Sequence, residues 1–303
     1  MRAVFAYGNP QTASGNWKEA PRHKYPGDIA RLRKQYFNSD DQLLTLAMAS
    51  PGGTPDEVLA VWKQARDVGA RITIHVGVGE FGRNALIEWI NATEPLRSDT
   101  TYVHCCTLND MEWKLIKDSG GAVSIAGYVE KLMGHGNPPV QKAIDAGIRP
   151  CLSVDVETSV PGDFFNQMRS VFSQQKNEVW TRQLAGEKNL PAFLKVRDVL
   201  EFATVEGARA NGLERKVGVL KPGMEADIIL MRTDRPNVMP VNNAVGAVVT
   251  SMNPANVDTV IIAGKMVKRD GKLVGVDMNK MFQLGRAAQD RAYKAAGVPL
   301  KRI

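Results

Sequence analysis

The 303-residue sequence predicts an α/β protein built around a parallel sheet. Short apolar runs alternate with segments of helical periodicity six times in a row, at a spacing of about 30 residues. Parallel strands joined by helices form either a barrel, the commonest long version, or an open doubly wound sheet, and the pattern alone leaves both open. Beyond about residue 216 the pattern changes to short strands separated by turns, which predicts a small β unit.

The strands of the parallel sheet are expected at residues 2–7, 42–49, 71–76, 101–105, 122–126 and 149–154. Helices are expected at residues 54–68, 80–91, 109–119, 139–146 and 163–174. The first of these helices has the clearest boundary signals. Thr54 and Glu57 have the spacing of a capping box, Pro55 suits the first turn, and Gly69 follows the last helical residue.

The C-terminal β unit is expected to contain strands at residues 226–231, 246–250, 257–262 and 265–268. Ala263-Gly264 and Asp270-Gly271 are suited to tight turns. A polar helix is expected at residues 279–296. The chain is therefore divided into residues 1–215, which form the α/β part, 216–275, which form the β part, and 276–303, which contain the closing helix.

Composition argues against several classes of function. The net charge is +7, but the 39 basic and 32 acidic residues are spread along the chain, and the densest basic patches lack the interleaved aromatic residues of a nucleic-acid surface. No run approaches the roughly 18 apolar residues of a membrane span. The three cysteines are an odd number, and two are the neighbours Cys105 and Cys106, which favours a reduced cytoplasmic location.

Three expected strands end in side chains that bind metals. His75, His104 and Asp155 each follow the apolar part of a strand, at residues 71–76, 101–105 and 149–154. In barrels the catalytic groups gather at the carboxyl ends of the strands. Two imidazoles and a carboxylate at that edge suit a borderline divalent ion such as zinc, iron or manganese.

Three blocks of sequence resemble the amidohydrolase superfamily, in its deaminase and chlorohydrolase branch. The first is IHVG at residues 74–77 with YVHC at 102–105, and the second is GIRPCLSVD at 147–155. The third is GARANGL at 207–213 followed by GVLKPGMEADIIL at 218–230. This resemblance implies an incomplete TIM-like (β/α) barrel of about six βα units with a small C-terminal portion of a β-sandwich.

The resemblance also implies roles for the residues at the strand ends. His75 matches a metal ligand, and His104 matches the histidine that lies beside the metal and polarises the substrate or orients the attacking water. Asp155 matches the aspartate that binds the metal and carries protons from the water to the leaving nitrogen. Because the chain offers few other metal ligands, His104 is also a candidate metal ligand. The implied cofactor is a divalent metal, most readily zinc, with iron or manganese as alternatives.

The sequence departs from the family pattern in ways that identify further candidates. Members begin with a His-x-His pair that supplies two ligands, and this chain has no such pair. In the family a glutamate usually lies three residues after the histidine that His75 matches. Here that position is Val78, and the nearest acid is Glu80. Glu80, Glu130 and His135 are therefore the candidates for substrate contact.

These observations predict a metal-dependent hydrolase that acts on a non-peptide C–N bond of a small nitrogenous compound, by deamination or by amide or ring hydrolysis. The alternative is a catalytically impaired member or fragment that keeps the fold and acts as a binding or oligomeric partner. By strand count the first two βα units are missing, which leaves open sheet edges that tend to pair. We therefore expect a homo-oligomer or a complementing N-terminal segment, a small-molecule substrate, and neither nucleic acid nor membrane as partner.

Overall fold

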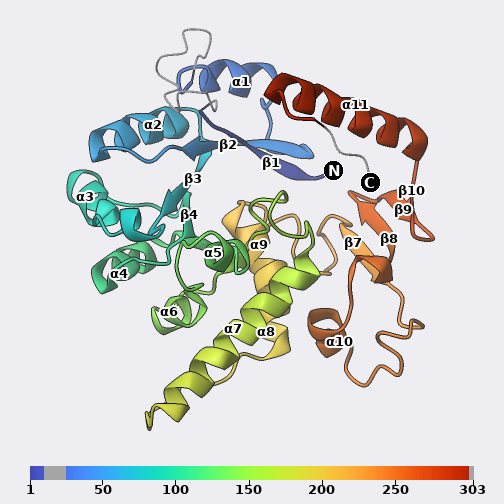
Figure 1. Ribbon diagram of the computed structural model, residues 1–303. Coiled ribbons are helices and arrows are strands. Elements are labelled where there is room, and N and C mark those ends of the chain that lie inside the picture. Colours follow the sequence, from blue (N-terminus) through green and yellow to red (C-terminus); the bar gives the residue numbers. More distant parts are fainter. Residues whose placement is uncertain (10–24, 300–303) are drawn as a thin grey trace.

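The computed structural model describes residues 1–9 and 25–299 of the chain. Its larger part is a parallel sheet in which each strand pairs with its neighbour in sequence. The strands are β1 (Ala3–Tyr7), β2 (Leu44–Ser50), β3 (Arg71–Val76), β4 (Thr100–His104), β5 (Ala122–Ile125) and β6 (Cys151–Leu152). The sheet curls, and its helices lie on the outer side (Figure 1). This arrangement is that of a barrel and not of a doubly wound sheet, so the prediction of an incomplete TIM-like barrel is confirmed.

The outer helices come from the crossovers between the strands. They are α1 (Ile29–Gln35), α2 (Pro55–Asp67), α3 (Leu86–Thr93), α4 (Asp110–Ser119), α5 (Val129–Leu132) and α6 (Val140–Asp145). The capping box of α2 is present, because the Thr54 side chain accepts from the Glu57 amide and the Glu57 carboxylate accepts from the Thr54 amide. Asn109 and Glu112 form a second box at the start of α4.

The core lies between the sheet and the outer helices. Along β3 the side chains of Ile72, Ile74 and Val76 are buried, while the alternating residues face the inside of the curl. Trp62 of α2 is fully buried against this layer, and its indole N–H donates to Ser50 Oγ at 3.1 Å. Burying these aliphatic and aromatic side chains stabilises this layer.

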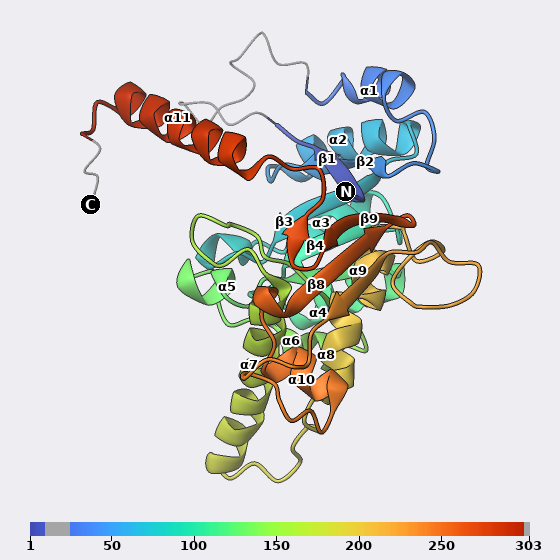
Figure 2. The same cartoon turned by 90° about the vertical axis from the view of Figure 1, so that its right-hand side faces the viewer.

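The chain continues from β6 into three helices and a second sheet. The helices are α7 (Phe164–Leu184), α8 (Val196–Ala203) and α9 (Val205–Ala210). The second sheet is antiparallel, in the order β10-β9-β8-β7, with β7 (Ile228–Met231), β8 (Val257–Ile262), β9 (Lys265–Arg269) and β10 (Lys272–Leu273). The helix α10 (Ala244–Thr250) lies between β7 and β8, and α11 (Met278–Ala296) projects from the body of the molecule (Figure 2).

Several element predictions need correction. Residues 246–250 were expected as a strand but belong to α10, because the Asn243 side chain caps a helix by accepting from the Gly246 amide at 2.8 Å. The helix expected at 80–91 is divided into a 3₁₀ turn at Glu80–Gly82 and α3. The helix expected at 163–174 continues ten residues further, as α7, to Leu184. In the described residues the C-terminal strands form a single sheet.

The curl of the sheet is open over the described residues, because β1 pairs only with β2 and β6 pairs only with β5. An ion pair spans from the start of β1 to the segment before β7. Arg2 Nε lies 2.7 Å from Asp227 Oδ2, and the same guanidinium pairs with Glu225. Among the residues that are described, no helix combines the length and apolarity needed to cross a bilayer.

Candidate active site at the carboxyl ends of the strands

His75 and His104 lie on neighbouring strands at the carboxyl edge of the sheet. The register pairs His75 with Val103, so His104 is one step further along. His104 has a left-handed backbone (φ 72°), which residues other than glycine rarely adopt. The two imidazole rings stack with centroids 5.4 Å apart and planes 20° apart. The structure therefore brings both histidines to one place, as the sequence predicts.

Asp155 reaches the same place from the loop after β6. Its backbone is also left-handed (φ 66°) and its Oδ2 lies 3.8 Å from His104 Nε2. Non-glycine residues in this region carry strain of about 1–3 kcal/mol each, and such residues concentrate at functional sites. The two residues with left-handed backbones, His104 and Asp155, both place their side chains in this one cluster.

His135 joins the cluster from the loop after α5. Its ring meets the His104 ring edge to face, with centroids 4.7 Å apart and planes 74° apart. The His135 Nδ1 atom is buried and has no hydrogen-bond partner in the part of the chain that the structure describes. Sequence spacing gave no indication that this loop histidine would contact a strand-end histidine.

A cavity of about 480 Å³ opens over the cluster. It is lined from the loops after β2, β3, β4, β5 and β6, and its lining includes His75, His104, His135 and Asp155. Glu130 is fully buried behind His104, and Glu80 is exposed and paired with Arg83 at 3.6 Å. Neither glutamate belongs to the lining.

The lining also contains apolar side chains that the sequence analysis missed. Phe81, in the turn after β3, is 95% exposed, and Met133, in the loop after α5, is 50% exposed. Phe81 falls within the helix expected at residues 80–91, and Met133 lies on a segment without strand or helical periodicity. No sequence signal marks either residue as part of a cavity lining.

The surroundings of His75 and His135 favour their neutral forms. The pKa of His75 is lowered, chiefly because neighbouring protein atoms displace water from the ring, and also because His104 is near; Asp155 opposes the shift. The side chain still opens to solvent on one side. Burial and His104 likewise lower the pKa of His135. Neutral imidazole is the form that binds a metal.

The donor set fits a zinc-type ion. Imidazole nitrogens and a carboxylate oxygen are the ligands of catalytic zinc, and two ligands of a tetrahedral zinc lie about 3.4 Å apart. The separation of 3.8 Å between His104 Nε2 and Asp155 Oδ2 is close to this value. In the described part of the chain, however, no three such donors already converge enough to chelate an ion. An ion held by His75, His104 and Asp155 would therefore require these three side chains to move closer together.

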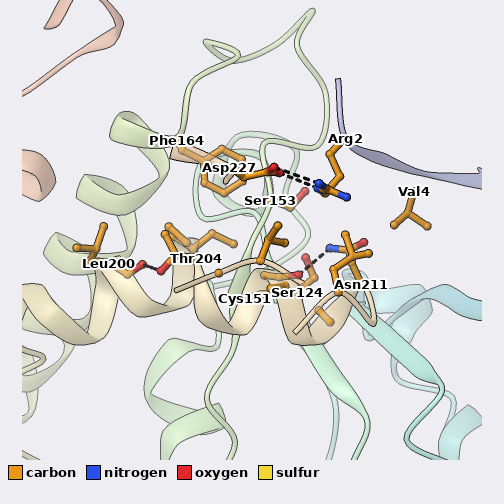
Figure 3. A pocket seen from close by; sticks show the side chains of 18 of the residues that line it. Arg2, Val4, Ser124, Cys151, Ser153, Phe164, Leu200, Thr204, Asn211 and Asp227 are labelled. Carbon is orange, nitrogen blue, oxygen red and sulfur yellow. Dashed lines mark hydrogen bonds and ion pairs between the residues drawn. The ribbon is translucent and has the colours of Figure 1, made fainter. Parts of the chain in front are cut away.

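A second, larger cavity of about 910 Å³ lies inside the curl of the sheet. Thr73 and Val103, which precede His75 and His104 on their strands, are part of its lining. Figure 3 shows Arg2, just before β1, and Val4 of β1 at one side and Asp227 and Phe164 at the other, with dashed lines joining Arg2 to Asp227. The interior of the curl is therefore not filled by the described side chains.

Together the fold and the cluster define a (β/α)-barrel protein with a metal-type donor set at the catalytic edge. The chain belongs to the amidohydrolase family, whose sequence profile matches residues 1–267.

The chain resembles curated deaminases over part of their length. A 5'-deoxyadenosine deaminase of Methanothermobacter thermautotrophicus is 29% identical over 271 residues, which cover 85% of this chain and 61% of the relative. A 5-methylthioadenosine/S-adenosylhomocysteine deaminase of Desulforudis audaxviator is 30% identical over 174 residues, covering 57% of this chain and 39% of the relative.

The fold resembles that of solved structures. The crystal structure of an adenosine deaminase from Xanthomonas campestris with bound zinc matches with a TM-score of 0.75 at 19% identity, over 86% of this chain and 60% of that chain. The chain thus spans about 60% of the length of the M. thermautotrophicus deaminase and of this solved chain.

Proposed function

We propose that this chain carries the catalytic edge of a metal-dependent hydrolase that removes an amino group from a small nitrogenous ring. One observation carries the proposal. His75, His104 and Asp155, from the ends of three different strands, line one cavity of about 480 Å³. The cavity has the size of a small-molecule site. The deaminase names of the relatives support deamination over other hydrolyses of C–N bonds.

Each residue has a role that its position permits. The Asp155 carboxylate accepts a proton from the attacking water and returns it to the leaving nitrogen, since it lies at the cavity within reach of His104. His104, buried and fixed, presents Nε2 to the cavity as a metal ligand. His135 contacts the substrate from the opposite loop. We place Glu80 and Glu130 outside the substrate contacts because neither lines the cavity.

The metal we propose is zinc, held by His75, His104 and Asp155, with iron and manganese as alternatives. A bound ion of this kind lowers the pKa of a coordinated water from 15.7 toward about 7, which supplies the nucleophile at neutral pH. The protein's own part is to keep the His75 imidazole neutral and to hold the Asp155 carboxylate beside His104. The left-handed backbones of His104 and Asp155 fix those directions.

The proposed activity is tested by ammonia release. Zinc-loaded protein is incubated with aminopurines, their nucleosides, aminopyrimidines and simple amides, and ammonia is measured with a coupled enzyme assay. We expect ammonia from at least one ring amine and none from the Asp155→Asn variant. Asparagine tolerates the left-handed backbone, so this variant keeps the local fold. Turnover of no ring amine, or unchanged turnover by Asp155→Asn, contradicts the proposal.

Asp118→Asn is the matched control for this assay. Asp118 is an exposed aspartate on α4 that pairs only with Lys114 among its described contacts. The same change of charge there is expected to leave ammonia release unchanged. Loss of activity in both variants would mean that the effect of Asp155→Asn is not local.

As a partner we propose a complementing segment of two βα units that completes the barrel. Three observations support it: β1 and β6 each pair on one side only, the cavity inside the curl measures about 910 Å³, and Val4, Val103 and Leu152 present apolar surface to it. Eight strands close a barrel of this type, two more than the described residues contain.

Mixing tests the complementing segment against a homo-oligomer. The chain is combined with a polypeptide of two βα units that carries a His-x-His strand, and its mass is measured by light scattering during gel filtration. We expect a one-to-one complex with a higher thermal midpoint and tighter zinc binding. A chain that elutes as a homo-oligomer, with neither property changed by the added segment, contradicts this proposal and supports self-association.

A further inference from the structure

Glu130 occupies a position that is costly for a carboxylate. It lies in the short helix α5, none of its surface is exposed, and its Oε2 atom is buried without a hydrogen-bond partner among the described residues. A buried carboxylate with an unpartnered oxygen lowers stability, and an apolar side chain of similar size would avoid that cost. Packing therefore gives no reason for a glutamate at this position.

The other carboxylate oxygen connects Glu130 to the site. Glu130 Oε1 accepts from the Ala126 amide at 2.8 Å and lies 3.4 Å from His104 Nδ1. The opposite nitrogen of the same imidazole, Nε2, faces Asp155 Oδ2 at 3.8 Å. His104 is thus held between two carboxylates, one buried and one at the cavity.

The backbone of Glu130 also positions the second loop of the cluster. Its carbonyl oxygen accepts from the amides of His135 at 2.8 Å and Gly136 at 3.4 Å. One residue thereby contacts the His104 ring through its side chain and fixes the start of the His135 loop through its main chain.

We propose that Glu130 is a positioning residue that holds His104 in the tautomer with the proton on Nδ1, so that Nε2 presents a lone pair to the cavity. A carboxylate accepts and cannot donate, so the nitrogen within hydrogen-bond distance of it carries the proton. Nδ1 lies 3.4 Å from Glu130 Oε1, whereas Nε2 lies 3.8 Å from Asp155 Oδ2, which is too far for a hydrogen bond. Partners of this kind orient a functional histidine and fix its tautomer. The tautomer assignment stands by itself, and only its effect on turnover rests on the proposed function.

The tautomer is measured directly by NMR. Chain labelled with ¹⁵N-histidine is examined at pH 7.5 without metal, and the His104 signals are assigned by their loss in His104→Gln. We expect Nδ1 to have the shift of a protonated nitrogen and Nε2 that of an unprotonated one. In Glu130→Gln and Glu130→Leu we expect a mixture of tautomers or the Nε2–H form. The Nε2–H form in the wild-type chain overturns the proposal, whether or not the Glu130 variants fold.

Glu112→Gln is the matched control, because Glu112 is an equally buried glutamate that accepts only from the backbone amides of Asn109 and Ile87 in its described contacts. Its replacement is expected to lower stability and leave the His104 tautomer unchanged. A tautomer that persists in both folded Glu130 variants, or that changes equally in Glu112→Gln, overturns the proposal.

Turnover gives a separate readout. With an active substrate, Glu130→Gln is expected to lower kcat about 10- to 100-fold with little change in KM, as is typical of residues that orient a functional histidine. An unaltered kcat beside a changed tautomer would remove the catalytic consequence and leave the tautomer assignment. Absence of any activity in the wild-type chain would contradict the proposed function alone.

Discussion

The backbone amide of Gly79 donates to the carbonyl oxygen of His135 at 2.7 Å. The carbonyl oxygen of Gly79 in turn accepts from Thr107 Oγ1 at 3.0 Å. One peptide segment therefore joins the loops that follow β3, β4 and β5, which are the loops next to His75, His104 and His135. The cluster is held together by these cross-loop hydrogen bonds as well as by the strands.

The loop after β3 depends on a glycine at position 82. A Cβ atom there would lie 2.4 Å from the Gly77 carbonyl carbon and 2.5 Å from its Cα. Gly82→Ala is expected to lower the free energy of unfolding by about 1–3 kcal/mol, as is typical of overpacking, and to weaken zinc binding. Urea unfolding and a zinc titration measure these effects. The control is Gly52→Ala, because Gly52 lines the same cavity and a Cβ there meets nothing within 4 Å. Equal effects of the two substitutions would contradict the role given to Gly82.

The lowered pKa values of His75 and His135 predict a pH-dependent stability. Between the lowered pKa and the ordinary value of 6.5, the folded chain binds fewer protons than the unfolded chain. The free energy of unfolding therefore rises with pH through that window, and this contribution is complete above 6.5 and lost as the pH falls below it. Thermal midpoints from pH 5 to pH 8 in chelator test this, and His75→Gln should flatten the slope. An identical slope in that variant would be inconsistent with the pKa shift.

The ion pair of Arg2 with Asp227 and Glu225 predicts that a single substitution, at the residue before β1, lowers the free energy of unfolding. The Arg2 side chain is only 7% exposed, so Arg2→Met leaves Glu225, and Asp227 at the cavity of Figure 3, without their ion-pair partner. We expect a loss of about 1–3 kcal/mol in urea unfolding. Arg31→Met is the control, because Arg31 is 49% exposed and solvent screens its pair with Asp28. Equal losses in the free energy of unfolding for the two variants would contradict the role given to the Arg2 ion pair.

Phe81 is expected to act on substrate affinity and not on stability. Its ring is 95% exposed and lines the cavity beside the histidines, where it can stack on a flat ring. Stacking of this kind is worth about 0.5–1.5 kcal/mol, so Phe81→Ala should raise KM roughly 2- to 10-fold and leave unfolding unchanged. Trp89→Ala, at an exposed aromatic on α3 outside the lining, should leave KM unchanged. An unaltered KM in Phe81→Ala would argue against the contact.

The sequence predicted those features that follow from regular periodicity. The strand at 71–76 was found with its observed bounds, because its alternation and flanking turns are clear. His75 and His104 were found because parallel strands present their carboxyl ends at one edge. The run at 246–250 was misassigned, since a short Val-rich segment suits a strand or a buried helix equally, and only the Asn243 cap decides between them.

The rest of the site depends on tertiary structure. Neither the left-handed backbones of His104 and Asp155 nor the contact of His135 with His104 has a local sequence pattern. Glu130 could be named as a candidate from the sequence, but its place behind His104, outside the cavity lining, required the structure. Such features arise where loops from different crossovers meet.

The most direct test of the account is the amount of zinc that the chain binds. Metal-free protein is dialysed against zinc at neutral pH, and bound metal is measured by elemental analysis for wild type, His75→Ala and Asp155→Asn. The account predicts about one tightly bound zinc per wild-type chain and a large loss of affinity in both variants. A wild-type chain that retains no zinc, or variants that bind it as tightly as wild type, would contradict the assignment of these residues to a metal site.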